Sequence, residues 1–244
     1  MNRTYNYDTW HLIGVVVIIL VLIIVFMIER TIPYYTNKVL AQKQEQKSIT
    51  DMQLSLSSLI NEGSPHLGEL SAPITLIDFS DFQCHLCARY VKNTEPLINE
   101  TYIQTGRVAL VFKHLPNRGF DSEGAHLAAQ CTNDQGRFWE FHKLLYENQQ
   151  AIDSGWVNED NLKKFASKIP GLNIEQFSSC FDSQKYKEFI ENDVVLAHSF
   201  GFLDTPSFIL ANSRDGSDPE IIRGAQPFPA FQSVIDKELK EFGQ

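Results

Sequence analysis

The sequence predicts an α/β fold in which a mixed β-sheet carries helices on its faces and contains an inserted helical domain. Two apolar runs flank a helical pattern in β-α-β order, which is typical of neighbouring parallel strands. A long helical stretch follows over about residues 120–200. Two further strands joined by a polar turn and then a last helix end the chain, so part of the sheet is expected to be antiparallel.

The β-α-β unit has the clearest local signals. A short extended piece lies near His66–Leu70, and the apolar strand Ile74–Ser80 leads into a helix over about Cys84–Tyr102. Pro96 lies inside this helix and predicts a kink, because proline removes a backbone hydrogen bond. The second buried strand, Val108–Lys113, completes the unit.

Several helices make up the insert. Asp121 or Ser122 is a candidate N-cap for the first, since both side chains accept hydrogen bonds from the first backbone N–H groups of a helix. An apolar face over Phe138–Leu145 predicts the second, and Gly201 is expected to end the last. The other helices are predicted over Ser154–Ile169, Ile174–Phe181 and Lys185–Phe200.

The C-terminal part reads as a hairpin and a helix. The strand Ser207–Ala211 is joined through the polar turn Asn212–Pro219 to the strand Ile221–Arg223, and a helix follows over about Phe228–Phe242. The complete order is βαβ, helices and then ββα. That order predicts a thioredoxin-like mixed sheet with an inserted helical domain.

Composition narrows the class of protein. The chain has 244 residues, 43% apolar residues and 17 Phe, which permit a substantial core. The net charge of −9 argues against a nucleic-acid partner, because phosphate binding needs a basic face. Four cysteines are an even number, compatible with two disulfides and with an oxidising compartment.

Residues 12–28 form an uncharged apolar run and predict a transmembrane anchor after a short tail at residues 1–11. As a helix the run would be roughly 25 Å long, near the lower limit for a bilayer core. Trp10 before it and Tyr34-Tyr35 after it match the aromatic residues of membrane interfaces. The alternatives are a cleaved signal peptide, although Glu29–Tyr35 is a poor cleavage site, and a buried core helix.

The charges beside the apolar run and the cysteines of the domain predict opposite membrane orientations. Arg3 and the N-terminal amine precede it, partly offset by Asp8. The basic residues after it are Arg30, Lys38, Lys43 and Lys47. Counted literally, these charges place the C-terminal domain in the cytoplasm. The even number of cysteines indicates an oxidising compartment instead, so we expect a single-pass cell-membrane protein whose C-terminal domain is extracytoplasmic.

Residues 29–62 are expected to link the anchor to the domain. Met52, Leu56, Leu59 and Ile60 form a short amphipathic stripe, which fits a spacer helix or stalk better than a dimerisation seam. Gly63-Ser64-Pro65 ends this pattern. The globular domain is therefore predicted to span residues 63–244, with the helical insert over about 118–200.

Cys84 and Cys87 form a C-x-x-C motif at the start of a helix and after a buried strand. This is a redox arrangement, because the sulfurs can close a small disulfide and the helix N-terminus stabilises a thiolate. We expect Cys84, the more exposed, to be the nucleophile with a lowered pKa, and Cys87 to resolve the mixed disulfide. A structural disulfide and a metal site are the alternatives. Zinc usually needs four ligands and Cys131 and Cys180 stand alone, so no metal and no cofactor is predicted.

Two further residues are candidates for the same site. A protonated His85 between the cysteines would stabilise the neighbouring thiolate, or it could face solvent and couple weakly. Asp78 lies in an apolar strand, where an acid costs free energy unless it is paired or functional. A surface-facing Asp at the strand end is the alternative.

From about residue 63 to the end, the chain resembles the DsbA family of thiol–disulfide oxidoreductases, in particular its membrane-anchored or secreted, BdbD-like branch. The segments that carry the resemblance are Ser71–Cys84, Ala128–Cys131 with Gln135–Trp139, Gly201–Pro206 and Arg223–Pro227. They occur in the family's order. The dipeptide His85-Leu86 differs from the commoner Pro-His, Pro-Tyr and Gly-Pro interiors, which affects the expected redox potential but not the chemistry.

The resemblance implies roles for particular residues. Asp78 would be a buried acid that transfers protons under Cys87. Thr205-Pro206 would be the cis-proline loop that pairs with a substrate peptide beside the nucleophile; an ordinary trans turn is the alternative. Cys131 and Cys180 would form a second, structural disulfide, with two buried free cysteines as the alternative.

The leading functional hypothesis is a membrane-tethered thiol oxidase. It would introduce disulfides into reduced or misfolded extracytoplasmic proteins and would be reoxidised by a quinone-linked membrane partner or another oxidant. The second hypothesis keeps the same fold but assigns another reaction: a reductase that breaks disulfides of its substrates, or an isomerase that rearranges them. A non-enzymatic metal-binding or structural module that uses Cys84 and Cys87 is the third alternative.

Overall fold

The computed structural model describes residues 63–214, 216–217 and 219–241, together with isolated positions 20, 26–27, 32, 38–40 and 42–43. Internal contacts divide the chain into residues 1–52 and 53–244. The predicted anchor at 12–28 and linker at 29–62 therefore lie almost entirely outside the described residues. Within the described part of the chain, no helix has both the length and the apolar character needed to cross a bilayer.

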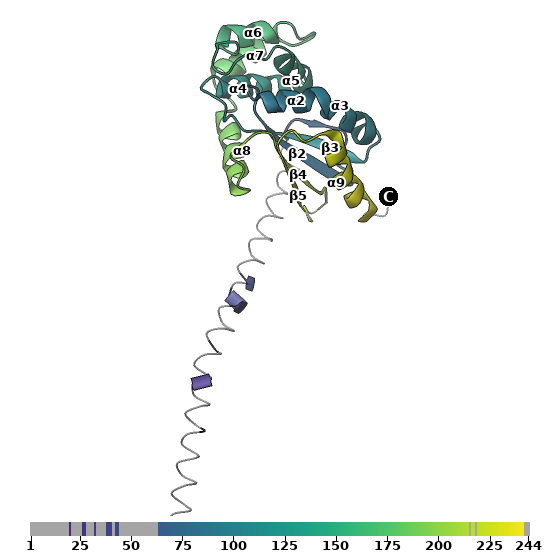
Figure 1. Cartoon of the computed structure of the whole chain (residues 1–244). Coiled ribbons are helices and arrows are strands. Elements are labelled where there is room, and N and C mark those ends of the chain that lie inside the picture. Colours follow the sequence, from purple (N-terminus) through teal and green to yellow (C-terminus); the bar gives the residue numbers. More distant parts are fainter. Residues whose placement is uncertain are drawn as a thin grey trace, which may run out of the picture. The chain divides into compact units, whose positions relative to one another are not determined.

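A five-stranded sheet of order β1-β3-β2-β4-β5 forms the centre of the domain (Figure 1). Its strands are β1 His66–Leu67, β2 Ile74–Ser80, β3 Val108–His114, β4 Ser207–Asn212 and β5 Glu220–Arg223. Strands β2 and β3 are parallel and the other neighbours are antiparallel, which confirms the predicted mixed sheet. All seven residues of β2 are buried, because helices cover both faces of this central strand.

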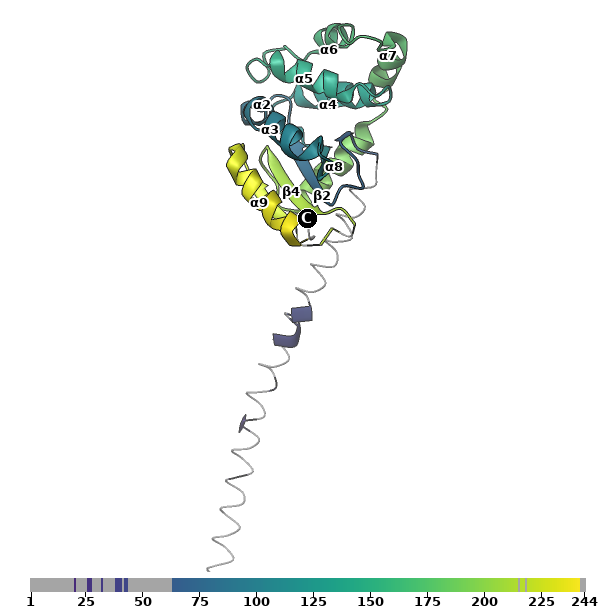
Figure 2. The same ribbon diagram turned by 90° about the vertical axis from the view of Figure 1, so that its right-hand side faces the viewer.

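The helices fall into two groups. Helices α4 to α7 form the insert and gather on one side of α2, whereas α8 and α9 lie on opposite sides of the sheet (Figure 2). The bounds are α2 His85–Asn93, α3 Glu95–Ile98, α4 Ser122–Asn133, α5 Phe138–Glu147, α6 Glu159–Ala166, α7 Ile174–Asp182, α8 Lys187–Ser199 and α9 Phe228–Glu241. A π-helical turn, Asn99–Ile103, follows α3.

Two apolar clusters meet at α2. In one, Tyr90 packs against Phe208 of β4 and Phe231 of α9. In the other, Phe82 before α2 contacts Phe112 of β3 and rings of the insert. Burial of large aromatic side chains contributes most of the apolar area here. Helix α2 is therefore fixed on two sides, by the sheet and by the insert.

Two predicted helices differ from the structure. The helix expected over Cys84–Tyr102 is divided at Thr94, because Pro96 at the second position of α3 cannot donate its backbone hydrogen bond. The helix expected over Ser154–Ile169 is shorter: α6 begins after Asn158, whose side chain caps it by accepting from Asn161 N. At α4, Asp121 occupies the N-cap position without capping through its side chain.

Candidate active site

The two cysteines of the C-x-x-C motif lie at the start of α2, shortly after the end of β2. Cys84 is the N-cap residue of α2, and Cys87 lies in its first turn. Both thiols are free, and both residues are buried, at 1% and 0% exposure, so the expected greater exposure of Cys84 is slight. Part of the cover comes from the insert, where Gln149 Nε2 donates to the carbonyl oxygens of Phe82 and Cys84 over 2.7 and 3.1 Å.

The surroundings of Cys84 stabilise its thiolate. A hydrogen bond from the Cys87 side chain is the largest contribution that lowers the pKa of Cys84, to about 5, and it outweighs burial. Thr205 and the backbone of Cys87 and Leu86 lower it further. Cys84 Sγ also lies 3.3 Å from the carbonyl oxygen of Thr205. When Cys84 is protonated, its thiol donates a hydrogen bond to this oxygen.

The pKa values of Cys87 and Asp78 are raised, whereas that of Cys84 is lowered. Burial, then the hydrogen bond with the Cys84 side chain, and then the charges of Cys84 and Asp78 raise the pKa of Cys87 well above its ordinary value. Burial raises the pKa of Asp78 to about 7, even though Ser80 Oγ donates to Asp78 Oδ1 over 2.5 Å. The site thus holds one stabilised thiolate, one thiol that keeps its proton, and a buried acid that can exchange a proton near neutral pH.

The peptide bond Thr205-Pro206 is cis and lies beside Cys84. Its loop is held by the loop after β3: Thr205 Oγ1 donates to Asn117 Oδ1 over 3.2 Å, and Asn117 Nδ2 donates to the Leu203 carbonyl oxygen over 2.9 Å. A pocket of about 430 Å³ adjoins the loop, lined in part by Leu86, Arg118 and Arg223. Two separate loops thus form the surface next to the nucleophile.

Asp81 joins the loop after β3 to the segment that leads into α2, and it was missed by the sequence analysis. Its carboxylate accepts from the backbone N–H groups of Gln83, Asn117 and Arg118 over 2.7, 2.6 and 2.8 Å, and from Ser122 Oγ over 2.8 Å. Burial raises the pKa of Asp81, and these hydrogen bonds oppose that rise. The only sequence signal was a second acid close to the C-x-x-C motif.

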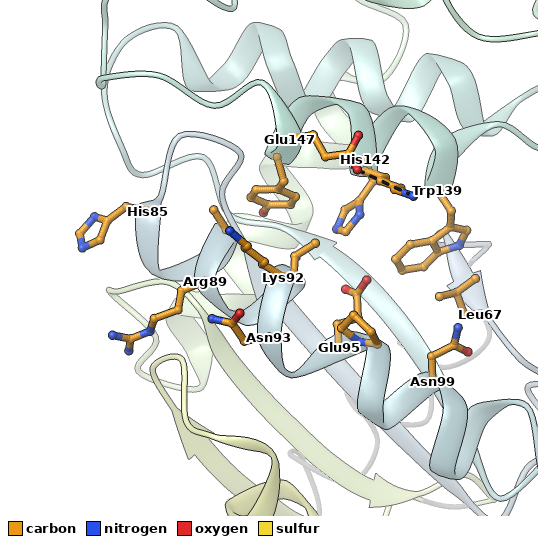
Figure 3. A pocket seen from close by; sticks show the side chains of 15 residues that line it. Leu67, His85, Arg89, Lys92, Asn93, Glu95, Asn99, Trp139, His142 and Glu147 are labelled. Atoms are coloured by element: carbon orange, nitrogen blue, oxygen red, sulfur yellow. Dashed lines mark ion pairs between the residues drawn. The ribbon is translucent and has the colours of Figure 1, made fainter.

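The remaining predicted residues lie as follows. His85 is exposed and is one of the residues that line the pocket between α2 and α5 (Figure 3), and it is not among the groups that lower the pKa of Cys84. Cys131 of α4 and Cys180 of α7 are joined by a disulfide with an S–S distance of 2.01 Å. Among the described residues, no three His, Cys, Asp or Glu side chains converge as metal ligands.

Comparisons with known proteins agree with this geometry. Residues 60–237 match the model of a thioredoxin family. The chain is 30% identical over 178 residues to the "Probable disulfide bond formation protein D" of Bacillus cereus, covering 72% of this chain and 78% of that protein. The chain belongs to the DsbA family of thiol–disulfide oxidoreductases.

Two solved structures place it within this family. Oxidised BdbD from Bacillus subtilis has a TM-score of 0.65 at 26% identity, covering 73% of this chain and 94% of the other. The α-DsbA1 protein of Wolbachia pipientis has a TM-score of 0.63 at 26% identity, covering 75% and 96%. The predicted resemblance is confirmed, and this DsbA-family enzyme is a thiol–disulfide oxidoreductase.

One more acid of this DsbA-family site escaped the sequence analysis. Cys87, Val91 and Glu95 are spaced by four residues and so share one face of a helix. Because Cys87 proves to be buried, this spacing could have placed Glu95 on the covered face. In the structure Glu95 Oε2 is buried without a hydrogen-bond partner among the described residues.

Proposed function

We propose that this enzyme is a thiol oxidase that introduces disulfides into reduced or misfolded extracytoplasmic proteins. The observation that carries the proposal is the opposite shift of the two cysteine pKa values, down to about 5 for Cys84 and well above normal for Cys87. A stabilised thiolate makes the reduced enzyme favourable and its disulfide a stronger oxidant. The names of the Bacillus relatives, which are disulfide bond formation proteins, support the same direction.

In the proposed reaction, a substrate thiolate attacks Cys84 Sγ of the Cys84–Cys87 disulfide. The sulfur–sulfur bond of the enzyme breaks and its electron pair stays on Cys87, which takes a proton from Asp78. A second substrate thiolate then attacks the substrate sulfur of the mixed disulfide, and Cys84 leaves as a thiolate. The substrate gains a disulfide and the enzyme leaves with two reduced cysteines.

The cis-proline face is the proposed substrate site. The backbone beside Pro206 would pair with an extended substrate segment next to Cys84. Phe120 and Leu203, which are 97% and 71% exposed, lie on the two loops that Asn117 joins. Such exposed apolar side chains suit contact with unfolded protein. His85, exposed at the same end of α2, is proposed to face the substrate.

The cellular arrangement is part of the proposal. Residues 12–28 would anchor the enzyme in the cell membrane, residues 29–62 would link the anchor to the domain beginning at residue 63, and the domain would be extracytoplasmic. A quinone-linked membrane partner would reoxidise the Cys84–Cys87 pair. The Cys131–Cys180 disulfide supports an oxidising compartment, because such bonds persist there.

Substitution Cys87→Ser is expected to trap the mixed disulfide. The serine keeps a hydrogen-bond donor beside Cys84 but cannot displace the substrate sulfur. The variant is first converted to the mixed disulfide of Cys84 with glutathione. A reduced, unfolded protein that has one cysteine should then displace glutathione from Cys84 and give an adduct on a non-reducing gel that disappears on reduction. The double variant Cys84→Ser/Cys87→Ser is the control and should give none. Absence of the adduct from a folded single variant would contradict the proposal.

The reduction potential of the Cys84–Cys87 pair decides the direction of electron flow. A value well above the roughly −270 mV of thioredoxin is expected for an oxidase. A value near or below it would favour a disulfide reductase instead. Equilibration with graded glutathione buffers, read by mass spectrometry after alkylation, gives this number.

A further inference from the structure

The small pocket beside the cis-proline loop carries two arginines. It has a volume of about 430 Å³, and Arg118 and Arg223 line it from two separate segments of the chain. Leu86 gives it an apolar wall, and Thr205 of the cis peptide bond lines it as well. Because the Thr205 carbonyl oxygen also contacts Cys84 Sγ, the pocket adjoins the position at which a substrate cysteine would meet the nucleophile.

The end of β5 holds Arg223 next to the cis-proline. Arg223 is opposite Ser207 in the ladder of β4 and β5, and Gly224 N donates to the Pro206 carbonyl oxygen over 2.9 Å. The guanidinium carbon of Arg223 lies 4.9 Å from the centroid of the Phe202 ring, so this ring supports the side chain from one side. The residue is exposed, and no carboxylate among the described residues pairs with it. Its positive charge is therefore available to a ligand.

Arg118 comes from the loop after β3 and already has one carboxylate partner. Its Nη2 lies 2.9 Å from Asp204 Oδ1, and the Asp204 side chain is 84% exposed. Arg118 Nε is buried and has no hydrogen-bond partner among the described residues, so Asp204 does not satisfy the whole guanidinium. Exposed ion pairs of this kind contribute little stability. An incoming carboxylate can therefore join or replace Asp204 at Arg118.

The charge of this pocket contrasts with the charge of the whole chain. Its lining holds two arginines and one aspartate, whereas the chain has a net charge of −9. A locally positive pocket in an acidic protein attracts anionic groups. Guanidinium groups bind carboxylates well, because their N–H groups match the two carboxylate oxygens. The chemistry of the lining thus fits a carboxylate ligand.

We propose that this pocket binds an acidic side chain of the substrate, so that the enzyme prefers cysteines that have Glu or Asp nearby. This inference rests on the proposed function and on the cis-proline face as the substrate site. A substrate segment that pairs with the cis-proline loop is extended, and side chains two residues apart on an extended strand point to the same side. An acid two residues from the reacting cysteine therefore faces the same surface as that cysteine. Arg118 and Arg223 bind this acid and take no part in the exchange of sulfurs.

Reduced peptides with two cysteines test this preference. They differ only at the positions two residues before and after each cysteine, which are Glu, Gln or Lys. The peptide thiols are oxidised to a disulfide, and the Cys84–Cys87 disulfide takes up their electrons and protons and becomes two thiols. Acid quenching, alkylation and mass spectrometry give kcat/KM for each peptide. Dividing by the rate of the same peptide with the neutral 2-hydroxyethyl disulfide removes differences in intrinsic thiol reactivity.

After this correction, the Glu peptide is expected to react roughly threefold faster than the Gln peptide, which is the effect of one partly exposed ion pair. The difference should lie in KM, and it should shrink at high salt. Arg223→Gln should remove most of it, and Arg223→Glu should favour the Lys peptide instead. Asp204→Asn should enlarge it, because Arg118 loses the carboxylate that competes with the substrate.

Lys92→Gln is the matched control for the loss of one positive charge. Lys92 is exposed, belongs to α2 and lines the separate pocket between α2 and α5 (Figure 3), so its removal should leave the preference unchanged. Moving the Glu residues six positions from the cysteines should abolish the preference, since they then lie roughly 20 Å away along an extended chain.

Two results would overturn the acidic pocket. One is an equal corrected rate for the Glu and Gln peptides while both are oxidised, which would leave the proposed function intact. The other is an equal loss of preference in Lys92→Gln and Arg223→Gln, which would indicate only a general charge effect. If the enzyme oxidises none of the peptides, the proposed function is wrong together with this inference.

Discussion

The Cys84 thiolate is expected to titrate near pH 5 in the reduced enzyme, and substitution Cys87→Ala should move its pKa upward. The Cys87 hydrogen bond is the largest contribution that lowers this pKa, so its loss leaves only Thr205 and the backbone N–H groups of α2. Cys87→Ser keeps a donor and should stay close to the wild-type value. Absorbance at 240 nm against pH measures the thiolate directly.

Alkylation provides a second measurement of the same effect. Each unit of pKa changes the thiolate fraction about tenfold at a pH below the pKa. At pH 6 the Ala variant is therefore expected to react with iodoacetamide more slowly than the Ser variant, by roughly tenfold if its pKa rises by two units. Equal pKa values in the Ala and Ser variants would contradict the assigned hydrogen bond.

The lowered pKa of Cys84 also makes the stability of the reduced enzyme depend on pH. Because the folded value of about 5 lies below the unfolded value, the stabilisation is fully present above about pH 9 and is lost as the pH falls through 5. At pH 7 it amounts to about 2–3 kcal/mol, or roughly 60 mV in a two-electron couple. Urea unfolding of the reduced and oxidised forms at pH 5 and pH 8 should show the reduced form losing this advantage at pH 5.

The strands and the redox helix were predictable because their signals are local. The apolar run of β2 and the C-x-x-C motif that follows it are continuous in sequence, and both lie where they were expected. The hairpin of β4 and β5 follows from a polar turn between two apolar runs. The break at Thr94 came from the same local chemistry as the kink expected at Pro96.

The polar connections of the site were not predictable from pattern. Asp81 joins groups that lie 36 to 41 residues further along the chain, and Gln149 reaches Cys84 across 65 residues. Such contacts depend on how the insert packs over α2, and a single Asp or Gln in a loop carries no periodic signal of its partner. Glu95 differs, since its four-residue spacing from Val91 and Cys87 could have indicated its face.

Substitution Asp193→Ala is expected to lower the free energy of unfolding by about 3–5 kcal/mol. Asp193 of α8 accepts from Lys113 Nζ over 3.0 Å and from the backbone N–H of His114 over 2.9 Å. Lys113 is 0% exposed and Asp193 is 3% exposed. Removing the carboxylate leaves a buried ammonium and a buried N–H without their partner. The midpoint of urea unfolding, with its slope, measures the loss.

The expected loss of stability in Asp193→Ala comes from leaving Lys113 buried without a partner, and not from losing a strongly stabilising ion pair. Burial holds the pKa of Asp193 above its ordinary value despite Lys113, so the charge pair itself adds little net stability. The double variant Lys113→Met/Asp193→Leu, which removes both charges, should therefore be more stable than Asp193→Ala. Glu220→Ala breaks an exposed ion pair with Lys237 and should change the free energy of unfolding by about 1 kcal/mol or less. If Asp193→Ala lowered the free energy of unfolding no more than Glu220→Ala does, the expected cost of an unpaired buried Lys113 would be contradicted. The Lys113 ammonium would then have found water or another partner in the variant.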